Sequence, residues 1–353
     1  MALLGYFFAL IISFYLLAEV SDRFFIPSLD KIAKRFNMSH DMAGATLMAI
    51  GSSAPELFVA IISLALPGDH GIIGIGTIVG SALFNLLGIG GASAVVRAAT
   101  LSWQPIVRDM LFYTLSIAAL FFVLRDGFVT EFEAGLMILF YVVYVFAVVK
   151  WRKIFPYVDQ DQIDEEETVD VELKTGWKRI LIPLDIILEK FFPPTRYYFA
   201  MFAISIIIIA ALCWVLVESA IGVSRIIHIP ELIIALTVLA VGTSVPDMIS
   251  SVIVAKQGRG GMAVSNAVGS NIFDILIGLG LPWLVYIIYT GGVLVGESEK
   301  GLDRSIIFLF ISVLVVFFTF WIRKWKVGPG IGYFFIIAYL FYLIWELMDV
   351  YLI

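Results

Sequence analysis

Long apolar runs alternate with short polar connections along almost the whole chain. A helix needs about 20 apolar residues to cross the hydrocarbon core of a bilayer, so runs of this length predict transmembrane helices. The pattern predicts ten spans, at about 3–20, 41–66, 71–96, 109–124, 132–149, 198–217, 231–255, 262–290, 305–322 and 331–352. We therefore expect an all-α polytopic membrane protein. Its first span is expected to be retained, because no basic region precedes it.

One polar segment, residues 151–197, separates a first half (1–150) from a second half (198–353), with five spans in each. Five is an odd number, so the second half is expected to sit upside down relative to the first, as in the inverted repeats of secondary transporters.

The polar segment itself is interpreted as a linker. Its acidic run, 159–172, has no EF-hand pattern, which favours a solvated linker over a regulatory cation site. The stretch 176–192 alternates bulky apolar and basic residues and is expected to lie on the membrane interface.

Charge and composition restrict the class of protein further. Charged residues make up 15% of the sequence and the mean hydropathy is +1.00, whereas soluble domains are about 25% charged. If the N-terminus is outside, 19 of the 23 Lys and Arg residues lie in inner connections. Because inner connections carry the excess of Lys and Arg in membrane proteins, both termini are predicted to lie outside the cell (plasma) membrane. A single cysteine, Cys213, excludes a disulfide framework. The lipid bilayer is the expected partner, and the sequence predicts no nucleic-acid partner, no obligate protein partner and no cofactor.

The stretch from Thr237 to Gly280 occurs twice, and its earlier copy runs from Thr46 to Gly90. Matching residues keep an almost constant spacing: Thr46, Gly51, Pro55 and Glu56 precede Thr237, Gly242, Pro246 and Asp247 by 191 positions, and Gly80, Ser81, Phe84 and Asn85 precede Gly269, Ser270, Phe273 and Asp274 by 189. An ordered series of this kind is an internal repeat.

Two acids lie in the middle of apolar runs, Glu56 in the second span and Asp247 in the seventh. A charge at the bilayer centre costs about 2.5–3.5 kcal/mol, so an acid at this depth is expected to have a structural or functional role. An interior ion pair is the structural alternative, but no Lys or Arg lies at a comparable depth in any span. The pattern therefore favours cation binding.

Neutral oxygen donors surround these acids in the sequence. Hydroxyls precede each acid by three or four positions, on the same helical face: Ser52, Ser53, Thr243 and Ser244. In the third and eighth spans, pairs of polar residues four positions apart share a face: Ser81 with Asn85, and Ser270 with Asp274. Calcium, sodium and potassium accept such all-oxygen ligand sets, whereas softer metals prefer nitrogen or sulfur.

The prolines near the acids predict broken helices. Pro55 and Pro246 lack an N–H, and Gly51 and Gly242 stand close by, so both helices should kink or break there. Irregular backbone at membrane depth is tolerated where it lines a cavity. Carbonyls freed by the breaks would add oxygen ligands, and those of Ala49 and Ala240 are the candidates.

These stretches resemble the two alpha repeats of the cation/calcium exchanger superfamily, and most closely its potassium-dependent sodium/calcium exchangers. The resemblance is carried by GATLMAIGSSAPELF and GIGTIVGSALFN within 42–91, and by GTSVPDMISSVIVAKQGRGGMAVSNAVGSNIFDILIGLGLPW within 237–283. It implies ten helices in two inverted five-helix repeats, with helices 2 and 7 broken and ions bound by helices 2, 3, 7 and 8.

The resemblance also implies roles for single residues. Glu56 and Asp247 would be the central calcium ligands, and the calcium and sodium sites would be completed by Ser52, Ser53, Thr243, Ser244, Ser81, Asn85, Ser270 and Asp274 with the carbonyls near Ala49 and Ala240. An acid at the position of Asp274 goes with potassium dependence in the family, and an asparagine goes with exchangers that do not need potassium. Ser52 departs from the pattern, because many members carry glycine or threonine there.

The predicted function is a secondary-active sodium/calcium antiporter with potassium co-transport, in which spans 1 and 6 move over a fixed core. Two alternatives stay open, a proton/calcium exchanger, because close carboxylates titrate, and a passive cation channel. An enzyme is not expected, because the sequence contains no HExxH, nucleophile elbow or phosphate-cradling loop.

Overall fold

The computed structural model of the protein describes residues 2–36, 49–68, 70–155, 190–256, 258–291, 294–295 and 300–349, and nearly all of them are helical. Eight helices are long and apolar enough to cross a membrane, and a ninth span arises when the bent pair Glu231–Thr243 and Val245–Lys256 counts as one. The all-α polytopic class is confirmed. The number of ten stays a prediction, because part of the expected second span, 37–48, lies outside the described ranges, as does most of the linker, 156–189.

The first span is longer than the sequence predicts. Instead of ending near residue 20, α1 (Ala2–Val20) continues through a π-helical turn, η1 (Ser21–Phe25), into α2 (Ile26–Arg35). Pro27 has no backbone N–H, so regular α-helical hydrogen bonding fails in the turn before it. The wider turn of η1 accommodates this defect and lets the helix continue.

Several outer spans also extend beyond their predicted ends. They are α8 (Trp103–Leu124), α9 (Glu131–Ile154), α11 (Tyr198–Ile227, preceded by the 3-10 turn η4, Thr195–Tyr197), α17 (Lys300–Ile322) and α18 (Pro329–Asp349). α8 begins before residue 109 because Arg108 Nε pairs with Asp109 Oδ1 at 2.7 Å, which lets both buried charges sit in the helix. α11 passes residue 217 and ends at His228 in left-handed backbone.

The two repeat copies form the centre of the molecule. The second span is described as α4 (Ala49–Ser52) and α5 (Ala54–Ala65), and the third as α6 (Gly71–Leu83), η3 (Phe84–Ile89) and α7 (Gly90–Val96). The seventh is α12 (Glu231–Ile234), η5 (Ala235–Leu239), α13 (Ala240–Thr243) and α14 (Val245–Lys256), and the eighth is α15 (Gly260–Phe273), η6 (Asp274–Leu279) and α16 (Gly280–Thr290). η3 and η6 occupy matching positions, and π-helical turns are frequent at functional sites.

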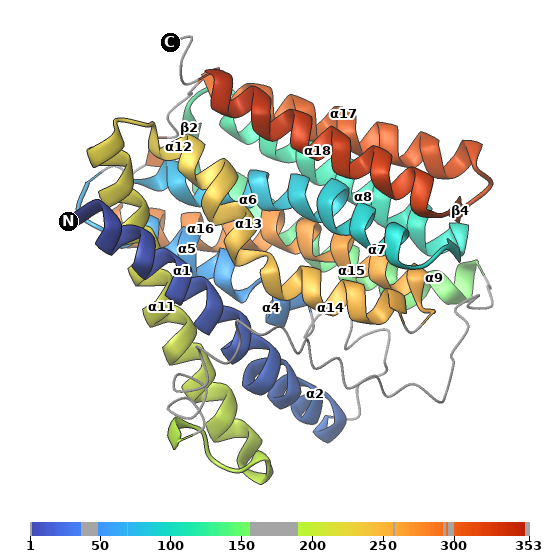
Figure 1. Ribbon diagram of the computed structural model, residues 1–353, viewed down its shortest axis with the longest axis horizontal. Coiled ribbons are helices and arrows are strands. Elements are labelled where there is room, and N and C mark those ends of the chain that lie inside the picture. The colour runs from blue at the N-terminus through green and yellow to red at the C-terminus, as the bar shows by residue number, and fades with distance from the viewer. Residues whose placement is uncertain are drawn as a thin grey trace.

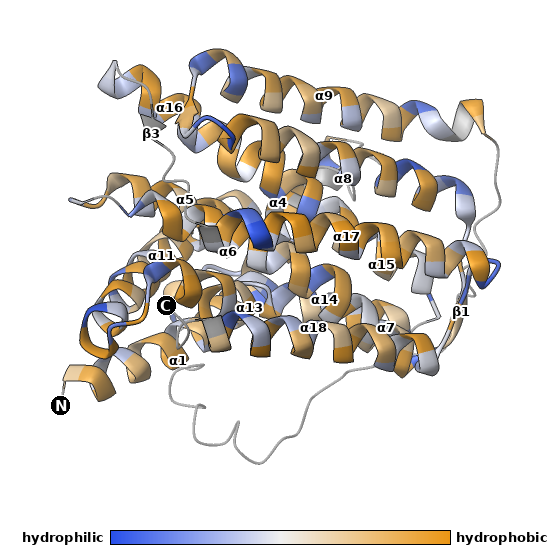
Figure 2. Ribbon diagram, turned by 90° about the horizontal axis from the view of Figure 1, so that it is seen from above, coloured by the Kyte–Doolittle hydropathy of each residue, from blue (hydrophilic) through white to orange (hydrophobic). Residues whose placement is uncertain are grey.

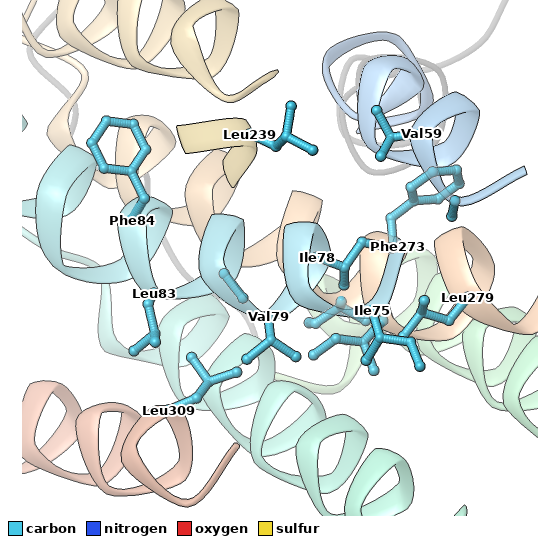
Figure 3. Packing of buried hydrophobic residues seen from close by; sticks show 14 of the residues in the cluster. Val59, Ile75, Ile78, Val79, Leu83, Phe84, Leu239, Phe273, Leu279 and Leu309 are labelled. Carbon is cyan, nitrogen blue, oxygen red and sulfur yellow. The ribbon is translucent and has the colours of Figure 1, made fainter. Parts of the chain in front are cut away.

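α6 is enclosed on all sides. In the span Gly71–Val96, 94% of the most apolar stretch is buried inside the protein. Figure 3 shows the side chains of α6 packed among residues from α5, η5, α15 and α17, including Val59, Leu239, Phe273 and Leu309. Apolar residues also cover most of the outer helices, as expected for surfaces that face lipid (Figure 2).

Two helices lie apart from this bundle. α1 and α11 pack side by side and cross the other helices obliquely (Figure 1). The N-terminal end of α1 and the C-terminal end of α18 lie at the same end of the molecule, which requires an even number of crossings.

Two short strand pairs connect the halves. β1 (Ala99–Thr100) pairs with β4 (Lys326–Val327), and β2 (Phe128–Val129) pairs with β3 (Leu294–Val295), both antiparallel. β1 and β3 follow the third span of their halves, and β2 and β4 follow the fourth. Each pair therefore joins one half to the other, and the two pairs lie at opposite ends of the bundle (Figure 1).

We expect Gly80→Ala to destabilise the protein. A Cβ at this position would meet the carbonyl oxygen of Leu236 and lie 2.7 Å from the Cβ of Ala240, which would push α6 away from the seventh span. Such overpacking costs about 1–3 kcal/mol and lowers the Tm measured in detergent. Gly135→Ala in α9 is the matched control, because nothing lies within 4 Å of its added Cβ. An equal fall in Tm for both variants would contradict the close-packing argument.

Candidate cation-binding site

Both helices that carry the predicted acids are interrupted by a single residue. Ser53 separates α4 from α5 with φ −93° and ψ 7°, and Ser244 separates α13 from α14 with φ −89° and ψ 5°. These angles fall in the sparsely populated bridge region, where many active-site residues are found. Pro55 and Pro246 follow at the same distance, and the seventh span bends there by 44°. The broken helices 2 and 7 expected from the sequence are therefore present.

Glu56 is enclosed by hydroxyl groups. Its side chain is 0% exposed, and its Oε1 accepts hydrogen bonds from Ser244 at 3.1 Å and from Ser81 at 3.5 Å. The two hydroxyl oxygens are 2.7 Å apart. Since Ser244 stands at the helix break of the second half, the break in one half closes over the carboxylate of the other.

Asn85 joins the two halves at the centre. Its amide nitrogen donates to Asn271 Oδ1 at 2.9 Å and to Asp247 Oδ2 at 3.3 Å, and it lies 3.5 Å from the hydroxyls of Ser81 and Ser270. A primary amide has two N–H groups, so the two shorter contacts account for both. The Oδ1 atom of Asn85 has no hydrogen-bond partner.

Asp274 is the third acid of the cluster. It is fully buried at the start of η6, it interacts electrostatically with Glu56 and Asp247, and Ser53 is the hydroxyl beside it. Ser52 is the hydroxyl beside the Asp247 carboxylate. The predicted acids and their hydroxyl neighbours thus come together from four spans.

Several buried oxygens of this cluster have no hydrogen-bond partner: Ser53 Oγ, Glu56 Oε2, Asn85 Oδ1, Asp247 Oδ1 and both carboxylate oxygens of Asp274. Buried polar atoms nearly always have a hydrogen-bond partner, so this set of oxygens indicates a site that binds a ligand. All of these atoms are hard oxygens, which suit calcium, sodium and potassium. Across the described ranges, no three or more Asp, Glu, His or Cys side chains are grouped to hold a metal by themselves. An ion here therefore needs the hydroxyl and amide oxygens as well.

The remaining predicted ligands lie at the edge of the cluster. Ser270 donates to the Ala267 carbonyl at 3.2 Å. Thr243 donates to the Leu239 carbonyl at 3.0 Å, and its hydroxyl lies 3.5 Å from the Ala240 carbonyl. Ala49 opens α4. A direct ligand role for these residues stays a prediction.

The sequence reasoning missed Asn271. This fully buried residue accepts the shortest hydrogen bond from Asn85, and its own amide nitrogen donates at 3.0 Å both to the Ala82 carbonyl and to the Tyr113 hydroxyl. It therefore fixes the orientation of the Asn85 amide. Its position next to Ser270 in the repeat was a usable signal.

Besides Asp109, a further buried acid lies outside the cluster. Glu346 of α18 is 1% exposed and accepts a hydrogen bond from Ser305 at 2.8 Å. The Tyr342 hydroxyl donates to the same serine at 3.4 Å. The sequence analysis did not single out Glu346, because no hydroxyl motif or proline accompanies it.

Polar side chains lead away from the cluster along α14 and α15. In the second half, Ser251 follows Asp247 by one turn and accepts a hydrogen bond from Asn266 at 3.3 Å, and Asn266 is half-buried. The equivalent of Asn266 in the first half, Thr77, is 0% exposed, and its hydroxyl has no hydrogen-bond partner. The cluster is therefore more closely covered along α5 and α6 than along α14 and α15.

The two halves each contain a broken helix, and together they enclose a buried cluster of oxygen atoms. This arrangement defines a secondary transporter of cations. The family model described as "Sodium/calcium exchanger protein" matches residues 6–150 and 197–348, and the chain belongs to this family. The unmatched stretch between these ranges falls in the expected linker.

Known relatives agree with this assignment. "Sodium/potassium/calcium exchanger 5" of Homo sapiens is 31% identical over 95% of this chain and 81% of its own length. "Sodium/potassium/calcium exchanger 4" of Homo sapiens is 28% identical over 95% and 79%. Among solved structures, the sodium-calcium exchanger NCX_Mj soaked with 2.5 mM Na+ and 1 mM Sr2+ has a TM-score of 0.59 at 23% identity, covering 97% of this chain and 98% of that one, which shows a shared fold.

We expect Asn271→Ala to weaken Ca2+ binding by about 10- to 100-fold, the range for groups that orient metal ligands. The change removes the acceptor of the shortest Asn85 hydrogen bond, so the amide can rotate away. Isothermal titration of the purified protein with Ca2+ measures the effect. Asn266→Ala on the same helix is the control, since its amide contacts Ser251. Equal Ca2+ affinity in wild type and Asn271→Ala would refute this positioning role.

Proposed function

We propose that the protein is a sodium/calcium antiporter that exchanges Na+ for Ca2+ by alternating access, with K+ co-transported. The observation that carries the proposal is the set of unpartnered buried oxygens at two equivalent helix breaks. Membership of the exchanger family and relatives named sodium/potassium/calcium exchangers support the choice of ions.

Exchange follows from the chemistry of the cluster. Glu56 and Asp247 supply two negative charges, which match one Ca2+ ion, and hydroxyls such as Ser244 supply neutral oxygens that Na+ also accepts. Ions that need the same oxygens exclude one another, so one must leave before the other binds. Asp274 adds a third charge and leaves room for a further monovalent cation, which is the role we assign to K+.

Alternating access requires the cluster to open first to one side and then to the other. The unequal cover of the two halves supports this, since Asn266 is half-buried and Thr77 is not exposed. α1 and α11 are the elements that would move. Phe14 of α1 lies against Gly242 at the break of the seventh span, and the Cys213 thiol of α11 donates to the Pro55 carbonyl at 3.6 Å. Each moving helix thus contacts the broken helix of one half.

The same proposal includes the cellular setting. The protein sits in the plasma membrane with both termini outside, as the distribution of Lys and Arg predicts, and the linker 151–197 lies in the cytoplasm. In this orientation Na+ entering down its gradient drives Ca2+ out of the cell.

The test of this function is Ca2+ uptake into sodium-loaded proteoliposomes. We expect an outward Na+ gradient to drive uptake in the wild type. Glu56→Gln should lower uptake by more than about 100-fold, since losing a group that merely orients a ligand already costs about 10- to 100-fold. Glu346→Gln is the control, because it neutralises a buried acid outside the cluster and should keep most of the activity.

Other outcomes would select a different function. Uptake that ignores Na+ but follows a pH gradient would replace the proposal by a proton/calcium exchanger. Single-channel currents without coupling would replace it by a channel. Similar losses in Glu56→Gln and Glu346→Gln would mean that the acid cluster has no special role.

The potassium requirement is expected to depend on Asp274. Wild-type uptake should need external K+, whereas Asp274→Asn should transport Ca2+ equally well with and without it, because the third charge that K+ neutralises has gone. Uptake measured with K+ and with an impermeant organic cation in its place gives the comparison, and Glu346→Gln, outside the cluster, serves as the control. A wild type that ignores K+ would remove potassium from the mechanism and leave sodium/calcium exchange intact.

A further inference from the structure

An aromatic groove lies at the end of the molecule where β1 pairs with β4, away from the cation cluster. It has a volume of about 410 Å³ and is lined by Trp103 and Val107 of α8, Phe317 and Trp321 of α17, and Trp325 of the turn before β4. This volume is within the usual range of small-molecule pockets, about 300–1,000 Å³. Trp103 is 47% exposed and Trp321 is 60% exposed, so the groove opens to the outside of the protein.

The turn that carries Trp325 is held in an uncommon backbone conformation. Lys324 and Trp325 have φ values of 52° and 62°, a region that favours glycine, and neither residue is glycine. The turn is fixed by hydrogen bonds from Trp325 N–H to the Phe320 carbonyl and from Leu101 N–H to the Trp325 carbonyl, both at 2.8 Å. Helices that end in this way normally place glycine at the first left-handed position. Backbone strain of this kind clusters at ligand clamps and other functional sites.

The strained turn orients Trp325 over the groove. Its ring meets Phe317 edge-on, with centroids 6.2 Å apart and an interplanar angle of 72°. The antiparallel pair β1–β4 then ties this turn to the chain that enters α8. One wall of the groove therefore comes from the first half of the protein and the other from the second half.

The exposed charges on the turn beside the groove are basic. Arg323, Lys324 and Lys326 are exposed beside Trp321 and Trp325, and residues 319–330 contain no acid. On the α8 side, Arg108 is paired with Asp109. The groove thus combines an apolar trough with an exposed basic rim.

The groove lies at the level where helices leave the membrane. Trp103 is the first residue of α8 and Trp321 stands at the end of α17, and tryptophans at such positions mark the membrane–water interface. A ligand at this depth meets hydrocarbon on one side and water on the other. Basic pockets between transmembrane helices bind anionic lipid headgroups.

We infer that this groove is a binding site for an anionic phospholipid. One acyl chain lies in the trough between Trp103, Trp321 and Trp325, and the phosphate is bound by Lys324 and Lys326. The bound lipid holds α8 against α17 and so links the two halves at this end of the bundle.

Tryptophan quenching by brominated lipids tests the site, with the full-length protein in detergent micelles. We expect brominated phosphatidylglycerol to quench with a saturable phase that brominated phosphatidylcholine reaches only at higher concentration. Each lysine near a membrane surface contributes about fivefold to binding of an anionic lipid, so Lys324→Gln/Lys326→Gln should lose about 25-fold in apparent affinity for phosphatidylglycerol. Its quenching by phosphatidylcholine should not change.

Two further variants separate the site from general effects. Lys150→Gln/Lys190→Gln removes the same charge from exposed positions that do not line the groove and should keep the preference for phosphatidylglycerol. Val107→Phe fills the trough and should abolish the saturable phase, with the Tm of each variant checked for folding. Equal quenching by the two lipids in the wild type, or equal losses in the two double-lysine variants, would overturn the inference and leave only ordinary lipid around the helices.

Discussion

The burial of three carboxylates in one cluster is the constraint on which the structure depends. Each charge at membrane depth costs about 2.5–3.5 kcal/mol, and like charges close together raise this cost. Neutral polar groups lower this cost: the Ser244 hydroxyl at the break of the seventh span and the Ser81 hydroxyl of α6 donate to Glu56, and the Asn85 amide donates to Asp247. These hydrogen bonds leave one oxygen of Glu56 and one oxygen of Asp247 without a partner. The oxygens that stay open require a cation, so the binding energy of the transported ion offsets the cost of placing the acids in the membrane.

The two halves are related by repetition, and the site works through the places where they differ. Asn85 occupies the position that Asp274 occupies in the other half, so the cluster holds three acids rather than four, and one amide bridges the halves. Asn271 has Ala82 as its counterpart and donates to the carbonyl of that residue at 3.0 Å. A strictly symmetric pair would either add a fourth carboxylate and lose the Asn85 amide, or replace Asp274 by a second amide. Divergence at a few positions therefore converts a repeated scaffold into a site with a defined net charge.

Much of this arrangement could be predicted from the sequence, for physical reasons. The length of the apolar runs identifies spans, the repeat spacing pairs Glu56 with Asp247, and the prolines locate the breaks, because each of these signals can be read along the chain without knowing its tertiary contacts. The role of Asn271 could not be predicted, since it depends on contacts with Tyr113 and Ala82 that are distant in the chain. Helix ends were also misjudged: α8 begins early because Arg108 and Asp109 neutralise each other, a pairing that a hydropathy pattern counts as two unfavourable charges.

The crossed strand pairs have a consequence for biosynthesis. β1 in the first half has its partner in β4, and β2 has its partner in β3, so neither strand of the first half can pair until most of the second half has been made. At about 5–20 residues per second, roughly 10–45 s separate the synthesis of Thr100 from that of Lys326. Until the second half has been made, the first half stands in the membrane with unpaired strand edges, and Glu56 lacks the hydroxyl of Ser244. The ribosome and the insertion machinery therefore have to hold a half-finished transporter in which Glu56 has Ser81 of its own half beside it but neither Ser244 nor its ion.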